Sequence, residues 1–416
     1  MNNNPAMITD RPPADSDPSR KETLTARKSL KIAVVAACPF PYPRGTPVRI
    51  QRLSDALGRR GHDVHVFAYH LGQAPGSDLY TIHRSLRLPT YKKYSPGPSP
   101  QKLLLMNPLL VAKLFRGLAG ARFDVIHAHH YEGLLVAKTA RAGRAIPLIY
   151  DAHTLLGSEL PFFAAGFTKG LGARVGVRLD RSLPRMADHI VAVTDTIKNK
   201  LEAYGLPDDR ITVITNGVES DLFRLPAAPA RPTGPPTLIF TGNLAGYQGV
   251  DHLLNAFAKI VRKRPDVRLL FVTNSSFEAY ERQAAELGIR GRIELSAAPL
   301  SEHARLLAAA AVAVNPRMDC DGIPQKLLNY MSAGRPTVSF AGSAPCIEHG
   351  KTGWVVTNGD VDAFADGVLN LLDDPDLAER LGRAAQAAVD AQFTWQIAAE
   401  KAENLYHRIL DDRGRR

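Results

Sequence analysis

The stretch that decides the fold is residues 310–338, AAVAVNPRMDCDGIPQKLLNYMSAGRPTV. Its first residues, 310–314, are an apolar run typical of a buried parallel strand, and the polar loop 315–322 follows where such a strand would end. A helix is expected from Pro324, a residue that suits a first helical turn, and a short apolar strand, 337–340, comes after it. Anions bind between a parallel strand's carboxyl end and the next helix, because free amides and the helix dipole point there. The segment therefore predicts an α/β sheet with an anionic ligand at this edge, although an ordinary strand–loop–helix unit would have the same outline.

The same stretch resembles the donor-binding segment of family 4 glycosyltransferases. The pattern of that family is E-G-F-G-x-P-x-x-x-E-A/Y-M-A-x-G-x-P-V-V, and the matching residues here are Gly322, Pro324, Tyr330, Met331, Gly334 and Pro336. The resemblance implies the GT-B fold, an α/β architecture of two doubly wound Rossmann-like domains that face each other across a cleft, with a C-terminal helix crossing back. It also implies retaining transfer of a sugar from a nucleotide diphosphate sugar, without a metal or other cofactor.

Two acidic positions of the family pattern are changed. Asp321 takes the place of the first Glu, which in the family touches the donor sugar, and Asn329 takes the place of the second, which binds the ribose hydroxyls. Asp321 is one methylene shorter than Glu, and Asn329 can hydrogen-bond a diol but carries no charge. The resemblance places Lys326 near the diphosphate, and Arg317 supplies a second cation in the same loop.

A second phosphate-binding loop is predicted after the apolar segment TLIFTG. In the family this loop reads G-R-x-x-x-x-K-G, and its Arg and Lys hold the diphosphate. Asn243 and Gln248 occupy those places here, and neither is cationic. Gly242, Gly249 and the start of the following helix still offer backbone amides. These changes indicate a divergent branch. They also motivate an alternative, a catalytically weakened protein that binds nucleotide sugar or acts as a scaffold; a nucleotide-sugar epimerase lacks a supporting acid cluster.

The acceptor side is predicted at two strand ends of the N-terminal half. His127 and His129 end the apolar segment 125–128, and Asp151 and His153 end the next one. The family carries H-x-H at the first of these ends, and its second His lies beside the transferred sugar, so His129 is the candidate residue there and His127 supports it. No nearby acidic set completes a ligand group, so a metal is not predicted. The predicted catalytic residues are therefore His129, Lys326, Asp321 and Arg317.

The loop after the first apolar strand, 31–37, carries Arg44 and Gly45. In the family the matching loop is Gly-rich and lies between the donor phosphates and the acceptor, so these two residues are its best local counterparts. A plain turn with a surface arginine would look the same.

Residues 84–122 combine basic and apolar side chains. Arg84, Arg87, Lys92, Lys93 and Lys102 alternate with Leu, Tyr and a Pro-rich break, and the helical pattern QKLLLMNPLLVAKLFRGLAG has apolar residues well in excess of one stripe. Such a segment could dock on an anionic membrane or carry a lipid acceptor. A buried helix after a long loop is the other interpretation.

The length of 416 residues, of which 45% are hydrophobic, suits two domains better than one core. The expected order is a disordered leader (1–29), an acceptor-binding domain (30–225), a Pro- and Ala-rich linker (226–236), a nucleotide-sugar-binding domain (237–392) and a final helix packed on the first domain (393–416). No apolar run of about 18 residues is recognised, so no membrane span is expected.

The net charge of +11 and the pI of about 9.6 favour an anionic substrate or surface. Nucleic acid is not predicted, because no basic helix with interleaved aromatics and no Cys/His finger spacing occurs. The three cysteines show no C-x-x-C pattern, which fits a reducing cytosol. The expected partners are a nucleotide sugar, a lipid-linked or saccharide acceptor and an anionic membrane. The expected location is the cytoplasm, peripheral on the inner face of the membrane, and the expected pathway is synthesis of a bacterial cell-surface polysaccharide or glycolipid.

Overall fold

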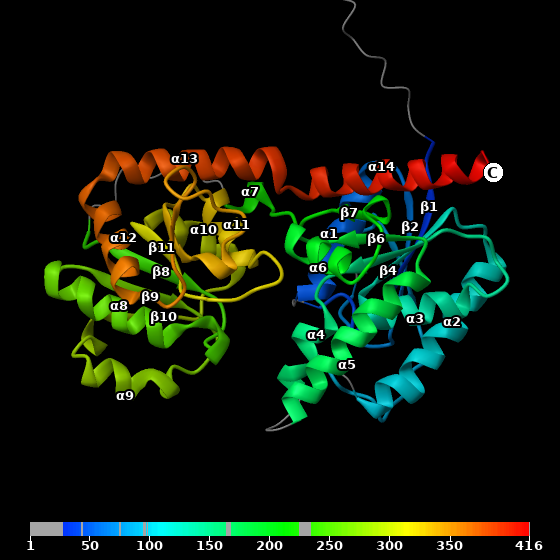
Figure 1. Cartoon of the computed structure of the whole chain (residues 1–416), viewed down its shortest axis with the longest axis horizontal. Helices are drawn as coiled ribbons and strands as arrows, with labels where there is room; N and C mark the ends of the chain where they lie inside the picture. Colours follow the sequence, from blue (N-terminus) through cyan, green and yellow to red (C-terminus); the bar gives the residue numbers. More distant parts are fainter. Residues whose placement is uncertain are drawn as a thin grey trace, which may run out of the picture.

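The computed structural model describes residues 28–42, 45–74, 76–94, 97, 99–163, 168–223 and 234–415. Its strands form two parallel sheets that stand side by side in Figure 1. The first sheet has the order β3-β2-β1-β4-β5-β6-β7. Its strands are β1 (Lys31–Ala36), β2 (Asp63–Ala68), β3 (Thr81–Arg84), β4 (Val125–His129), β5 (Leu148–Ala152), β6 (His189–Ala192) and β7 (Ile211–Val213). The second has the order β10-β9-β8-β11-β12-β13 and consists of β8 (Thr237–Thr241), β9 (Arg268–Val272), β10 (Ile293–Ser296), β11 (Val312–Asn315), β12 (Thr337–Phe340) and β13 (Trp354–Val356).

Helices connect the parallel strands and cover both faces of each sheet. Those of the first half are α1 (Gly45–Arg59), a π-helical turn (Lys102–Met106) continuous with α2 (Asn107–Gly120), α3 (His130–Ala140), α4 (Leu156–Glu159), a 3₁₀ turn (Leu160–Phe163), α5 (Thr168–Ser182), α6 (Asp195–Ala203) and α7 (Ser220–Phe223). Those of the second half are α8 (Val250–Lys263), α9 (Glu278–Glu286), α10 (Leu300–Ala309), α11 (Gln325–Ser332), α12 (Val361–Asp373), α13 (Pro375–Gln392) and α14 (Trp395–Gly414).

The strands at the centre of each sheet are buried on both faces, which explains why their sequences are mainly apolar. In β1, Ala33 and Val35 join the core that contains α2 and α3. Ile32 and Val34 join the core on the other face, with α1 and α14, because successive side chains of a strand point to opposite faces. In the second sheet, Ile239 belongs to the core with α11 and α13, and its neighbours in β8 to the core with α8 and α12.

The last two helices run along one side of the molecule and join its halves (Figure 1). α13 packs against α11, and α14 packs against α1. The C-terminal helix therefore crosses back onto the first sheet, and the two doubly wound domains have the GT-B arrangement that the sequence predicted. The domain boundaries stay predictions, because residues 1–27 and 224–233 lie outside the described part of the chain.

Both sheets place a strand-order reversal where the site was expected. β1 lies between β2 and β4, and β8 between β9 and β11. The connections leave in opposite directions at such a point, so a crevice opens outside the carboxyl ends of the strands, where ligands bind in open α/β sheets. The two crevices lie at the ends of β1 and β4 and at the ends of β8 and β11.

The continuous helix from Lys102 to Gly120 corrects one expectation. An 18-residue window in it has a mean hydropathy of 1.4, and 28% of that window is buried. By length and composition alone this helix is apolar enough to cross a membrane, so the sequence does contain such a segment. One helix of this kind is weak evidence for a span, since core helices of soluble proteins pass the same test.

Candidate active site

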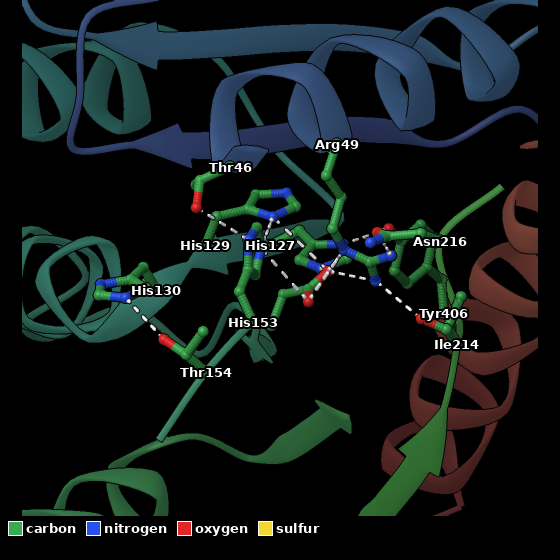
Figure 2. Close-up of polar contacts among 11 residues, drawn as sticks. Thr46, Arg49, His127, His129, His130, His153, Thr154, Ile214, Asn216 and Tyr406 are labelled. Carbon is green, nitrogen blue, oxygen red and sulfur yellow. Dashed lines mark hydrogen bonds and ion pairs between the residues drawn. The ribbon is translucent and has the colours of Figure 1, made fainter. Parts of the chain in front are cut away.

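Buried polar side chains of the first domain form one network at the carboxyl ends of β4 and β5 (Figure 2). Asp151 is completely buried and accepts two N–H groups of Arg49 from α1, the shorter at 2.9 Å. His127 Nε2 lies 3.1 Å from the same carboxylate, and His127 Nδ1 lies 2.6 Å from the hydroxyl of Tyr406 on α14. Arg49 also donates to acceptors just after β7. The network thus ties α1, β4, β5 and the returning helix α14 together.

The network holds the ionised carboxylate of Asp151 next to two neutral rings, those of His129 and His153. Burial opposes ionisation of Asp151, but Arg49 and then the neighbouring histidines hold the pKa of this carboxyl well below its usual value. Burial lowers the pKa of His129 well below its ordinary range and that of His153 to about 3. Both rings are therefore neutral at physiological pH, and His129 can exchange hydrogen bonds with a ligand without bringing a positive charge.

His129 lies where this network meets a cavity. Its Nδ1 is 3.0 Å from His153 Nε2, and His153 Nδ1 is 3.2 Å from the Thr46 hydroxyl at the start of α1. These contacts are satisfied when Thr46 donates to His153 and His153 donates to His129. In that arrangement His129 presents its Nε2–H, which has no partner among the described residues, at the cavity that it lines.

The cavity has a volume of about 120 Å³ and combines aromatic walls with two acid–base pairs. Lys102 forms an ion pair with Glu132, and His130 Nε2 lies 3.0 Å from Glu159 Oε2. Glu132 is 3% exposed, and its Oε1 has no hydrogen-bond partner among the described residues. The tyrosines of the wall are Tyr42, Tyr91, Tyr94 and Tyr131.

The backbone is strained beside this cavity. His130, which directly follows β4, has a φ of 62°, and no other described residue except glycine has a positive φ. A side chain in this left-handed region costs on the order of 1–3 kcal/mol, and such strain gathers at functional sites. The strain places His130 next to Glu159 and leaves His129 at the strand end.

The second crevice, at the ends of β8 and β11, holds Lys326. Its ammonium nitrogen lies 2.7 Å from Gln248 Oε1 and 3.7 Å from the ring centre of Phe240. A Cβ built on Gly242 would lie 3.5 Å from the same nitrogen. The surrounding protein, and after it Arg317, lower the pKa of Lys326 well below its ordinary value. An anion that entered here would favour the charged form of this amine.

Two glycines shape the loop beside Lys326. Gly242 and Gly249 have φ values of 123° and 71°, which disfavour other residues. A Cβ on Gly249 would also lie 2.2 Å from the carbonyl oxygen of Pro316. Asn243 accepts from the Ala245 amide at 3.1 Å, which shapes the same turn. The loop therefore packs directly on the loop after β11, and α8 starts at their junction.

Asp321 contacts the first domain. Its side chain forms an ion pair with Lys200 of α6 at 2.5 Å, and its carbonyl accepts from the Thr194 hydroxyl at 2.6 Å. Nearby, the side chain of Gln325 donates to the Gly217 carbonyl at 3.1 Å and approaches Asn329 Oδ1 at 3.4 Å. The donor loop is thus fastened to the other domain through the residue that replaces the family's first Glu.

Two family models match the chain. The model described as Glycosyltransferase Family 4 matches residues 43–222, and the model described as Glycosyl transferases group 1 matches residues 235–374. D-inositol 3-phosphate glycosyltransferase of Corynebacterium aurimucosum is 30% identical, over 91% of this chain and 96% of that protein. The chain belongs to glycosyltransferase family 4. It is a retaining glycosyltransferase that takes its sugar from a nucleotide sugar, as the sequence predicted.

Other proteins with different names are also similar to this glycosyltransferase. The MMP α-(1→4)-mannosyltransferase of Mycolicibacterium hassiacum is 26% identical over 92% of this chain and 98% of that protein. The structure of sucrose-phosphate synthase from Thermosynechococcus elongatus superimposes with a TM-score of 0.75 at 20% identity, covering 92% of this chain and all of that one. HepE of Anabaena, solved with UDP and glucose, superimposes with a TM-score of 0.67 at 20% identity, covering 90% of this chain and 99% of that one. The structural likeness establishes the fold.

The predicted site residues of the glycosyltransferase fall into separate layers. His129 and His153 lie at or beside the first cavity, whereas His127 and Asp151 are buried behind them. Lys326 lies with Gly242, Asn243, Gln248, Gly249 and Arg317 at the second crevice. Asp321 instead pairs with Lys200, Gly322 follows it in the chain, and Asn329 lies beside Gln325. Gly45 is the first residue of α1 and not part of a loop, and Arg44 lies outside the described residues. The roles given to all of these residues stay predictions.

One group of the glycosyltransferase resembles a metal site in composition. Ligand atoms of His127, His129 and Asp151 lie within 4.8 Å of one another. Both carboxylate oxygens of Asp151 face the guanidinium of Arg49, and a second cation there would meet its repulsion. The geometry gives no support to a metal at this point, and the expectation of none stays a prediction.

Four residues of the site were not predicted from the sequence. Arg49 stands beside Ile50 in a helix whose apolar face contains Leu53 and Leu57. A charge on that face is a signal that could have been found. Tyr406 and Lys200 act through partners 279 and 121 residues away, and no local pattern reports such pairs. The unpaired oxygen of Glu132 is likewise visible only in the structure.

Proposed function

We propose that this glycosyltransferase moves a hexosyl group, with retention, from a nucleoside diphosphate sugar in the second domain to a saccharide or lipid-linked acceptor in the first. The observation that carries the proposal is the pairing of two crevices at strand-order reversals, one with Lys326 beside glycine amides and one with His129 at a cavity. The proposed setting is the cytoplasm and the synthesis of a cell-surface polysaccharide or glycolipid. Free thiols at all three cysteines are consistent with that compartment.

The diphosphate would lie between the Gly242 loop and the start of α11. The N-terminus of α8 offers amide groups and a favourable dipole, and Lys326 supplies the charge. In this divergent branch Gln248 stands where the family has a cation, and it accepts a hydrogen bond from Lys326. We infer that Gln248 positions Lys326, so that one ammonium group does the work that two cations share elsewhere. Arg317, stacked on Tyr247 at 4.9 Å, adds positive potential at the rim.

The transfer step then needs no enzymic nucleophile. The bond between the sugar's anomeric carbon and the diphosphate oxygen breaks, and Lys326 with the loop amides stabilises the negative charge of the leaving group. The acceptor hydroxyl attacks the anomeric carbon from the same face, and its proton passes to an oxygen of the departing diphosphate. His129, as a neutral donor through Nε2–H, would hydrogen-bond the sugar as positive charge develops at the anomeric carbon.

The cavity supports an acceptor with hydroxyl groups on an apolar body. Four tyrosines form walls against which a sugar ring or a hydrocarbon can lie. The free oxygen of Glu132 is buried and would gain a hydrogen bond from an acceptor hydroxyl. Lys102 is already paired with Glu132. The cavity therefore offers little free positive charge for the phosphate of a phosphorylated polyol. It suits a neutral saccharide better, because the groups that line it can hydrogen-bond hydroxyls.

A weakened, sugar-binding protein is the second candidate. Its support is that the Asp321 carboxylate is already paired with Lys200 and that burial lowers the pKa of Lys326 well below its ordinary value. Purified protein should be incubated with UDP-, GDP- and TDP-sugars, with and without an organic extract of bacterial lipid-linked saccharides. The proposal expects nucleoside diphosphate release that depends on the extract, with the sugar recovered in the organic phase. Thermal protection by a nucleotide sugar without any release would favour the binder.

A further inference from the structure

The helix that runs from Lys102 to Gly120 has apolar residues on two opposite sides. Its inner side, Met106, Leu110, Leu114 and Leu118, is buried in the core of the first domain. Its outer side carries Leu104 and Leu105, which are 73% and 45% exposed, followed by Pro108, Ala112 and Phe115 at helical spacing. A helix on the surface of a soluble domain normally has a polar outer side. The outer side is therefore an apolar surface that is exposed at Leu104 and Leu105.

The sequence around this helix is rich in basic residues, of which Lys102 is paired with Glu132. From residue 79 to residue 123 the sequence contains no Asp or Glu and eight Lys or Arg: Arg84, Arg87, Lys92, Lys93, Lys102, Lys113, Arg116 and Arg122. Arg116 and Arg122, near the end of the helix, are exposed, as are Arg87 and Lys92 in the preceding loop. Arg144 lies 4.5 Å above the ring of Phe115 and adds a further charge next to the apolar side.

We propose that the outer side of the 102–120 helix, with the basic residues around it, is a docking surface for an anionic lipid bilayer. Exposed leucines flanked by cations are what an interfacial helix requires, since the apolar side enters the headgroup region and the cations meet anionic lipids. The buried inner side ties the helix to α3. The helix therefore lies on the membrane with its domain and does not span it. The charge complementarity favours a lipid surface over a second copy of this basic chain.

The acceptor cavity opens beside this surface. Lys102, at the start of the helix, lines the cavity. Tyr94 and Gly97 line it too, and a Cβ on Gly97 would lie 2.4 Å from the ring of Phe163, which is 46% exposed. A second groove, of about 430 Å³, shares Tyr94 with the cavity and is lined by Lys92. On the proposed function, an acceptor could keep its sugar end in the cavity while its apolar chain stays in the bilayer.

The test measures membrane binding alone, so it is independent of whether the acceptor has been identified. The full chain is sedimented with vesicles of phosphatidylcholine and phosphatidylglycerol at about 7:3, and with vesicles of phosphatidylcholine only. Leu104→Glu combined with Leu105→Glu removes the apolar contact. The matched control is Leu295→Glu, because Leu295 is 46% exposed but lies in β10 of the other domain. Circular dichroism melting of each variant checks that the fold is retained.

We expect wild-type protein and the Leu295→Glu variant to bind the anionic vesicles, and binding to weaken as salt is raised. The double variant should bind on the order of a hundredfold more weakly, as expected when two leucines no longer enter the bilayer. Equal binding by the double variant, or equal binding to uncharged vesicles, would overturn the proposal. So would a dimer in solution that the double variant abolishes, because the surface would then belong to a second copy. Loss of sugar transfer with intact vesicle binding would contradict the proposed function and leave this surface standing.

Discussion

Replacing Lys326 by methionine tests the donor site most sharply. Methionine keeps an unbranched apolar stem over the ring of Phe240 and removes the ammonium group beside Gly242. The fold should survive, because among the described residues that nitrogen donates a hydrogen bond to Gln248 alone, and this glutamine can turn to water. A loss of ligand affinity would then report on the charge itself.

The expected losses follow from the contacts of one charged donor. A hydrogen bond to a charged group contributes about 1.5–3 kcal/mol, which corresponds to about a 10- to 150-fold loss of nucleoside diphosphate affinity. Turnover should fall further, by on the order of 10²–10³ in all, because negative charge grows on the leaving group. The free wild-type protein has a Lys326 pKa well below its ordinary value, so binding of the diphosphate takes up a proton and weakens as the pH rises above that lowered pKa.

The fold itself should gain stability from the substitution. Between the lowered pKa of Lys326 in the folded chain and the ordinary lysine pKa of about 10.4, the Lys326 amine is protonated in the unfolded chain but not in the folded one. Wild-type stability therefore falls as the pH drops through this window, and the methionine variant escapes that loss. At neutral pH its unfolding midpoint should equal or exceed that of the wild type.

The assay pairs three measurements on the same preparation. Calorimetric titration with UDP and GDP in two buffers of different ionisation enthalpy gives the affinity and the proton uptake, a coupled assay gives nucleoside diphosphate release, and a thermal scan gives stability. Lys263→Met is the matched control, because Lys263 is an exposed lysine of the same domain, paired with Asp366. Affinity within about twofold of wild type, in a variant that melts normally, would show that Lys326 does not touch the diphosphate.

Three further predictions concern the first domain and its contact with the second. His129→Ala should lower turnover by about 10²–10³ and leave nucleotide affinity unchanged; a histidine that only packs would instead cost roughly 2 kcal/mol of stability and spare the rate per folded molecule. Asp151→Asn should cost about 3–5 kcal/mol at neutral pH by leaving Arg49 buried without a counter-charge. Since the folded pKa of Asp151 is depressed, urea titrations should show the difference shrinking as the pH falls below about 4, and a constant difference would contradict the assignment. Lys200→Met should increase the radius of gyration in solution scattering, because the ion pair of Lys200 with Asp321 joins the domains. The matched Lys198→Met in the same helix should not. Equal radii of gyration for the two variants would show that this ion pair does not hold the domains together.

The sequence predicted the fold well where strands are buried on both faces. KIAVVA and TVSF are short segments rich in apolar and β-branched residues, and they form β1 and β12. β3 was not predicted, because it is a half-buried edge strand whose TIHR carries no apolar run. The 102–120 helix left two interpretations open, since a composition that is apolar on all sides suits both a core helix and a membrane surface. Only the burial of its individual residues showed that one side faces outward.

The candidate site was predictable as far as its residues follow strand ends. His129 and Asp151 lie at adjacent positions of paired strands, 22 residues apart, and parallel strands bring their carboxyl ends to one edge. Arg49 sits three residues after Thr46 in a helix, and only its full burial shows that its charge must be compensated. The contact of Tyr406 with His127 and that of Lys200 with Asp321 depend on the return of α14 and on the approach of the two domains. Only tertiary packing brings these residues together, so no local sequence pattern could predict the two contacts.

The most direct test of sugar transfer with retention is the configuration of the product. The nucleotide sugar that supports release of nucleoside diphosphate should be supplied as its α-anomer, and the anomeric proton of the isolated product should be examined by NMR. We predict an α-linked sugar on the acceptor and one nucleoside diphosphate released per linkage formed. A β-linked product, or free sugar released without any linkage, would contradict the assignment of this chain as a retaining transferase.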